Sequence, residues 1–207
     1  MSVPQEVRSD AWPAVGRDAV AGRTVAPGEG LDPSLPGLRN VFFFGHIGAG
    51  KSFLGRHLEL SRGWRFHEGD DDLTDAMRRA VAQRQPFTPE MRTEFVDRLS
   101  GRLEQLNRGP SPWCLAQGLF KNSERAILRR RFPELAFVWV RASELTLRRR
   151  LGARIDHVAD LAYAEFANPF LETPDFPHVE VWNEGDAEHA VLQMAQALKR
   201  SYGERSL

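Results

Sequence analysis

The chain has a single cysteine and no excess of charge of either sign. Cys114 is the one cysteine among 207 residues, which excludes an intramolecular disulfide and a cysteine-based metal cluster and favours a reducing compartment. The 28 basic and 28 acidic side chains cancel to a net charge of +0. A chain without net charge has no long-range field that would attract nucleic acid or an anionic membrane. We therefore expect neither of these partners.

Long hydrophobic runs are also missing. The longest, Val41–Phe44 and Leu135–Val140, are far shorter than the roughly 18 residues needed to span a bilayer. The first residues lack the basic-then-apolar order of a secretory signal peptide. With 42% hydrophobic and 27% charged residues, the composition is typical of a soluble globular protein, and 207 residues suit one domain. These features predict a cytoplasmic protein.

Residues 1–38 differ in composition from the rest of the chain. They are rich in proline and glycine and show no sustained periodicity of a strand or a helix. Such a segment cannot bury enough apolar surface to order itself. We predict a flexible N-terminal arm over residues 1–38 and a folded domain over residues 39–207, with a short partner-binding or processed segment as the alternative for the arm.

From residue 39 onward, short apolar runs alternate with longer amphipathic stretches. The expected strands are Val41–Phe44, Trp64–His67, Trp113–Ala116, Ala136–Val140 and Val179–Trp182. The expected helices begin at Lys51 and at Thr88-Pro89-Glu90, or cover about Leu73–Arg84, Ser123–Arg131, Ser143–Leu151, Ala159–Ala167 and Ala187–Tyr202. Strands that alternate with helices predict a parallel sheet covered by helices on both faces.

The segment GHIGAGKS fits the phosphate-binding pattern G-x-x-x-x-G-K-[ST] and lies between an expected strand and an expected helix. Its glycines allow successive backbone N–H groups to turn toward phosphate oxygens, and the helix that follows adds a positive dipole end. Lys51 would reach the β- and γ-phosphates, and Ser52 would bind Mg²⁺. The alternative is a glycine-rich turn without a ligand. The predicted nucleotide-binding residues are Gly45, His46, Ile47, Gly48, Ala49, Gly50, Lys51, Ser52 and Phe53.

Two other classes of P-loop protein fit less well. The guanine-specificity pattern N-K-x-D of GTPases has its nearest match in NEGD (Asn183–Asp186), where glutamate replaces the lysine, and no D-x-x-G follows a strand. A motor or AAA-type ATPase requires an apolar strand that ends in an acid. The strand in WCLAQG ends instead in Gln117-Gly118.

Acidic residues follow the second expected strand, in FHEGDDDL. The carboxyl ends of parallel strands converge on the ligand crevice, so Asp70 is expected near the phosphates. There it could orient an acceptor hydroxyl as a general base or hold Mg²⁺. Asp71 and Asp72 are expected to begin the next helix, where acids interact favourably with the helix dipole.

Several further segments match one family in order and spacing. They are FHEGDDD, QPFTPEMRTEFVDRL (Gln85–Leu99), GLFKNSERAILR (Gly118–Arg129), RLGARIDHV (Arg150–Val158) and EFANPFLETP. Together with the P-loop, these segments resemble the gluconate kinase and shikimate kinase group of small P-loop kinases, from about Val41 to Leu198. The resemblance implies a three-layer α/β/α fold with a five-stranded parallel sheet in the order 2-3-1-4-5 and a short lid. It also implies transfer of the γ-phosphate of ATP, with Mg²⁺, to a hydroxyl of a small molecule, most simply a sugar acid or polyol.

The resemblance assigns roles residue by residue. Arg150 would lie over the adenine, and Arg154 would enter the site as a catalytic residue beside Lys51 and Asp70. The acceptor would contact Asp70, Arg92, Gly118 and Lys121, and Mg²⁺ would contact Ser52 and Asp70. The alternatives are a solvated basic helix end for the RRRLGAR segment and surface salt bridges for Arg92 and Lys121.

The acceptor side departs from the family pattern. Where the family has His-Pro, Asn and Lys, this chain has Leu73, Thr74, Met77 and Ala80. At the position of the family's first acid, this chain has Glu68. A second function therefore stays open, that of a nucleotide-binding regulatory or accessory protein that has lost its acceptor pocket. The expected partner is a hydroxyl-bearing small molecule, and a homodimer is left open.

Overall fold

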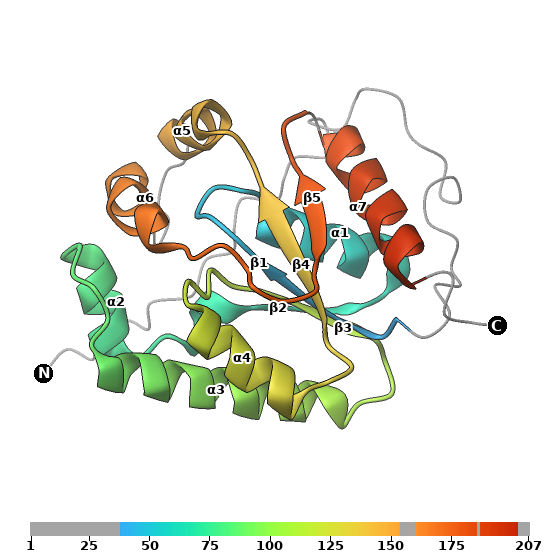
Figure 1. The fold of residues 1–207 in the computed structure, drawn as a ribbon, viewed down its shortest axis with the longest axis horizontal. Coiled ribbons are helices and arrows are strands. Elements are labelled where there is room, and N and C mark those ends of the chain that lie inside the picture. The colour runs from blue at the N-terminus through green and yellow to red at the C-terminus, as the bar shows by residue number, and fades with distance from the viewer. Residues whose placement is uncertain (1–37, 154–159, 186, 203–207) are drawn as a thin grey trace, which may run out of the picture.

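The computed structural model describes residues 38–153, 160–185 and 187–202 (Figure 1). The predicted arm therefore lies outside the described residues, apart from Leu38, which is buried. Arg154 lies outside them as well. No helix in the described part of the chain has the length and apolar character needed to cross a membrane.

The centre of the molecule is a five-stranded parallel sheet in the order β2-β3-β1-β4-β5. Its strands are β1 (Asn40–Phe44), β2 (Arg65–Glu68), β3 (Trp113–Ala116), β4 (Ala136–Arg141) and β5 (Val179–Trp182). The predicted strand order is confirmed, and the predicted strand bounds differ by at most one residue at an end. With β1 in the middle of the sheet, its carboxyl end lies between those of β3 and β4.

Helices cover both faces of this sheet (Figure 1). They are α1 (Lys51–Arg62), α2 (Asp75–Ala82), α3 (Pro89–Asn107), α4 (Asn122–Arg131), α5 (Glu144–Gly152), α6 (Leu161–Ala167) and α7 (Ala187–Tyr202). Val41 and Phe43 of β1 belong to the core on the side of α1 and α7. Phe42 and Phe44 belong to the core on the side of α3 and α4. This alternation confirms the three-layer α/β/α architecture, because β1 contributes apolar side chains to both cores.

Local signals set several helix starts. The Thr88 hydroxyl accepts a hydrogen bond from the Met91 N–H, and Pro89 is the first residue of α3, as its sequence predicts. Asp71 and Asp72 were expected to begin the next helix. They instead close the 3₁₀-helix Gly69–Asp72, and α2 begins only at Asp75.

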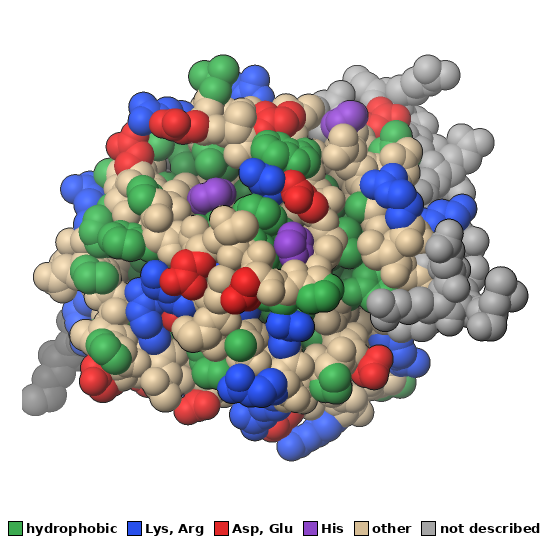
Figure 2. Space-filling view, in the orientation of Figure 1, with side chains coloured by type: hydrophobic (Ala, Val, Ile, Leu, Met, Phe, Trp, Pro, Cys, Tyr) green, Lys and Arg blue, Asp and Glu red, His purple; other side chains and the backbone are tan. Residues whose placement is uncertain are grey.

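Charged side chains of both signs are interspersed over the face shown in Figure 2, in keeping with the balanced composition. Burial keeps the Cys114 thiol neutral by raising its pKa, as expected for an inert core cysteine.

Candidate active site

The loop between β1 and α1 has a backbone that only glycine tolerates at two positions. Gly45 has a φ of 140°, and a Cβ there would lie 2.2 Å from the Val140 carbonyl oxygen. Gly50 has a φ of 95° at the start of α1, and its Cβ would lie 2.2 Å from the Asn183 amide nitrogen. The glycines thus let β4 and the segment after β5 approach the loop closely, which fixes a curved backbone at the helix N-terminus.

Lys51 is folded back along this loop. Its ammonium donates hydrogen bonds to the carbonyl oxygens of Gly45 at 3.1 Å and of His46 at 2.8 Å. Burial, followed by the charges of Lys51 and Arg141, lowers the pKa of His46, so its imidazole is neutral at pH 7. The cation of the cradle is therefore Lys51.

Two asparagines from distant parts of the chain hold the loop from outside, and sequence reasoning did not assign either of them. The Asn168 side chain accepts from the Ile47 N–H at 2.8 Å and donates to the Ile47 carbonyl at 3.3 Å. The Asn183 amide, only 3% exposed, donates to the Ala49 carbonyl at 2.9 Å. The loop conformation therefore depends on side chains from beyond α5 as well as on its own glycines.

Arg150 contacts both partners of the hydrogen bond between Asn183 and Ala49. Its guanidinium donates to the Asn183 side-chain oxygen at 2.9 Å and to the Ala49 carbonyl at 3.4 Å. It also donates to the Gly185 carbonyl at 3.4 Å. Arg150 thus lies beside the P-loop, in the segment that the family resemblance assigns to the nucleotide, while its stacking on adenine stays a prediction.

The acid that interacts with residues of the P-loop is Glu68, the last residue of β2. Burial raises the pKa of Glu68 to about 6. The hydrogen bond from the Ser52 hydroxyl opposes this rise, the charge of Asp70 adds to it, and the charge of Lys51 opposes it. Sequence analysis treated Glu68 only as a departure from the family pattern. Its place at the strand end, directly before the acids that were singled out, was the signal for it.

Asp70 lies two residues further along the chain and has different neighbours. Its carboxylate accepts a hydrogen bond from the Gln117 side chain at 3.0 Å, while Arg78 donates to its backbone carbonyl at 2.8 Å. Burial, then the charge of Asp70, raises the pKa of Tyr163 on α6. Asp70 is therefore oriented by the end of β3 and lies near a neutral phenol, two partners that no sequence motif indicated.

The two cations expected to face the acceptor each have an acidic partner. Arg92 on α3 forms an ion pair with Glu124 on α4 at 3.0 Å. Lys121, which precedes α4, forms one with Glu172 at 3.1 Å. Both side chains thus form ion pairs within the chain, and their contact with an acceptor stays a prediction. Gly118 is buried, and its N–H donates to the Gln117 side chain.

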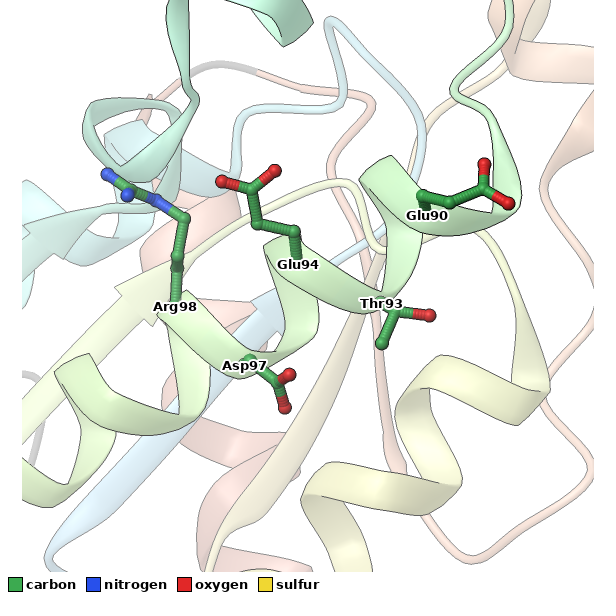
Figure 3. A pocket seen from close by; sticks show the side chains of 5 residues that line it. All are labelled: Glu90, Thr93, Glu94, Asp97 and Arg98. Atoms are coloured by element: carbon green, nitrogen blue, oxygen red, sulfur yellow. The ribbon is translucent and has the colours of Figure 1, made fainter.

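A pocket of about 680 Å³ lies along α3 (Figure 3). In Figure 3, Thr93 and Asp97 point away from the side of the helix that carries Glu94 and Arg98. The pocket is lined by Glu90, Thr93, Glu94, Asp97 and Arg98, none of which is a predicted site residue. The pocket is a shallow acidic surface of one helix, separate from the residues gathered around the P-loop.

A family model described as an AAA domain matches residues 41–168, from β1 in the middle of the sheet through Asn168, the first of the two asparagines that hold the P-loop. The chain belongs to this AAA-domain family, even though the strand in WCLAQG lacks the terminal acid expected of a motor or AAA-type ATPase. The matched region includes the P-loop, Glu68 and Asp70, and the residues of both ion pairs except Glu172. No curated protein sequence matches the chain.

Solved structures identify the type of P-loop fold. A gluconokinase from Sinorhizobium meliloti 1021 has a TM-score of 0.69 and 25% identity, with coverage of 80% of this chain and 94% of that one. A sugar kinase from Janibacter sp. HTCC2649 has a TM-score of 0.66 and 17% identity, covering 81% and 95%. Shikimate kinase from Aquifex aeolicus vf5 has a TM-score of 0.53 and 14% identity, covering 80% and 99%. The fold is therefore that of the small-molecule P-loop kinases, and the family resemblance seen in the sequence is confirmed.

Proposed function

We propose that the protein is an ATP-dependent kinase that transfers the γ-phosphate to a hydroxyl of a polyhydroxylated small molecule. One observation carries this proposal: the glycine-shaped loop and Lys51 lie at the carboxyl end of the sheet, with Glu68 and Asp70 beside them. A phosphate cradle next to a carboxylate provides both halves of a phosphoryl transfer, the donor site and a base for the acceptor.

The cradle acts on the donor by positioning and charge. Backbone N–H groups of the loop and the N-terminus of α1 point at phosphate oxygens, and Lys51 neutralises charge that develops on the γ-phosphate. Asn183 and Arg150 keep the Ala49 end of the loop in place. On the acceptor side, Asp70 takes the proton of the attacking hydroxyl, and Gln117 orients its carboxylate.

The residues present suit a magnesium ion. No group of three histidine, cysteine, aspartate or glutamate side chains within the described residues forms an all-protein metal site. Instead, the Ser52 hydroxyl lies against Glu68, with Asp70 nearby, an oxygen-only set that leaves places for phosphate and water. Ser52, Glu68 and Asp70 would hold Mg²⁺, and the ion would offset charge on the phosphates.

One observation favours a second candidate, a nucleotide-binding regulatory or accessory protein. Arg92 and Lys121 are both engaged by acids of the chain itself, so neither of these two cations expected on the acceptor side is free. Such a protein would bind ATP tightly and show no turnover that depends on an added acceptor.

Acceptor-dependent release of ADP distinguishes these candidates. The purified protein is assayed with Mg²⁺ and ATP against a panel of sugars, alditols, sugar acids and amino acids. Lys51→Ala should abolish turnover, because nothing else in the loop carries a full positive charge. Lys199→Ala, a change of an exposed lysine on α7, is the matched control and should retain it. Full activity of Lys51→Ala would overturn the kinase proposal, and ATP binding without acceptor-dependent turnover would favour the second candidate.

A further inference from the structure

The charges around Asp70 bear on which acceptors fit. A substrate carboxylate needs a cation with free hydrogen-bond donors and no acid in competition. Arg92 and Lys121 lie on the acceptor side by family resemblance, yet each forms an ion pair with an acid of the chain, at 3.0 Å and 3.1 Å. Arg78, on α2, directs its guanidinium to the backbone carbonyl of Asp70.

Glu124 is the more buried of the two acids that compete with a substrate carboxylate for these cations. It is 8% exposed, and its second carboxylate oxygen accepts the Lys121 N–H at 3.2 Å at the start of α4. A substrate carboxylate that took Arg92 would leave this buried carboxylate without its cation. Breaking a buried pair in this way is strongly unfavourable, because the remaining charge stays desolvated. Glu124 therefore opposes an anionic acceptor at Arg92.

The second pair acts in the same direction. Glu172 accepts from the Lys121 ammonium and from the Asn122 N–H at 2.7 Å, and both bonds help to lower the pKa of its carboxyl group.

We propose that the acceptor is an uncharged polyol or sugar and that Glu124 excludes sugar acids by neutralising Arg92. This inference rests on the proposed kinase function. In the transfer, the acceptor oxygen bonds to the γ-phosphorus as the bond from that phosphorus to the β–γ bridging oxygen breaks. ADP leaves with that oxygen, and the hydroxyl proton passes to Asp70. An uncharged acceptor can be held by hydrogen bonds alone, as the carboxylate of Asp70 and the amide of Gln117 allow.

Pairs of acceptors that differ only in charge test the proposal. Glucitol and gluconate share five hydroxylated carbons and differ at the first carbon, which is an alcohol in one and a carboxylate in the other; xylitol and xylonate form a second pair. The ratio of kcat/KM for the alditol to that for the acid is measured by ADP release. We expect the wild-type ratio to be about 10 or more, since Arg92 and Lys121 are already paired with acids of the chain and offer a substrate carboxylate no free cation.

The variant Glu124→Gln keeps the shape and the hydrogen-bond acceptor and removes the charge. It should shift the ratio toward the acid by about tenfold, because Arg92 gains a free charge. Glu104→Gln is the matched control: it breaks the Arg131 ion pair between the same two helices, about 18 Å further along α3, and should leave the ratio unchanged. The wild-type ratio needs no variant, so it decides the question even if Glu124→Gln does not fold.

The outcomes separate this inference from the function on which it rests. Turnover that favours gluconate over glucitol would overturn the inference, leave the kinase function standing and point to Arg78 as the anion site. An unchanged ratio in Glu124→Gln would overturn the role of Glu124. ATP binding without turnover of either member of any pair would overturn the kinase function and the inference with it.

Discussion

Replacing Glu68 by glutamine should make the ligand-free protein more stable and the enzyme weaker. Burial raises the pKa of this carboxyl group from 4.5 to about 6 in the folded protein. Keeping it ionised at neutral pH therefore costs about 2 kcal/mol, at about 1.4 kcal/mol for each pH unit of the difference. Glu68→Gln removes that cost and retains a hydrogen-bond acceptor for Ser52. For a chain of this size the gain corresponds to a rise in Tm of about 4 to 8 °C.

The pH dependence of this gain follows from the direction of the shift. Folding strengthens proton binding by Glu68, so its destabilising effect is absent below about pH 4.5 and complete above about pH 6. The difference in unfolding free energy between Glu68→Gln and wild type should thus rise from near zero to its full value across this window. Urea unfolding without nucleotide between pH 4.5 and 8 measures it. Glu134→Gln, at an exposed position, is the control and should follow the wild type.

Mg²⁺ and ATP should reduce the stability difference between Glu68→Gln and the wild type. Ligand that binds only the folded state stabilises it in proportion to its affinity, and Glu68 is expected to help hold the ion beside Ser52. Glu68→Gln should therefore gain less Tm from saturating Mg²⁺ and ATP than the wild type, and lose about tenfold or more in kcat. An unchanged Tm without ligand, or a gain that persists undiminished at pH 4.5, would refute the reasoning.

Two further predictions concern the acceptor base and the P-loop support. Asp70→Asn should lower kcat by about 100-fold or more, with an unchanged Kd for ATP in a fluorescence titration; the reverse pattern would reassign Asp70 to metal binding. Asn183→Ala should remove the 2.9 Å hydrogen bonds that the Asn183 side chain makes to the Ala49 carbonyl and to Arg150. We expect a loss of about 1 to 3 kcal/mol in unfolding free energy and weaker ATP binding, and an unchanged Kd would show that the loop holds its shape unaided.

Most of the fold could be predicted because its signals are local. Trp113–Ala116 and Val179–Trp182 are bounded apolar runs, and both were placed at the residues where the strands lie. The start of α3 is set by a threonine cap and a proline at its first residue, which can be read directly. The turn at Gly69–Asp72 was harder, because Asp72 is fixed by His67 on β2 and Arg102 on α3 rather than by its neighbours in sequence.

The candidate site also has a part that could be predicted from local sequence and a part that could not. The phosphate loop is encoded in consecutive residues, so its position follows from the sequence alone. Its supports do not: Asn168 and Asn183 reach it across 121 and 134 positions, and neither belongs to a motif with a phosphate-binding mechanism. Arg92 could be assigned to the acceptor side, but its pairing with Glu124 depends on how α3 lies against α4. Side-chain contacts between separate helices, strands and loops produce no periodic pattern in a single sequence, so they could not be predicted from it.

The two asparagines that hold the phosphate loop also say something about how the chain is made. A ribosome completes the loop motif when residue 52 is added, whereas the side chains that fix its backbone come from residues 168 and 183. Contacts over such long separations close late, after the local helices and the middle strands. A nascent chain therefore carries the full motif without a finished nucleotide site until residue 183 has been added. We expect competence to bind the donor to arise only when β5, the last strand in chain order, joins the sheet.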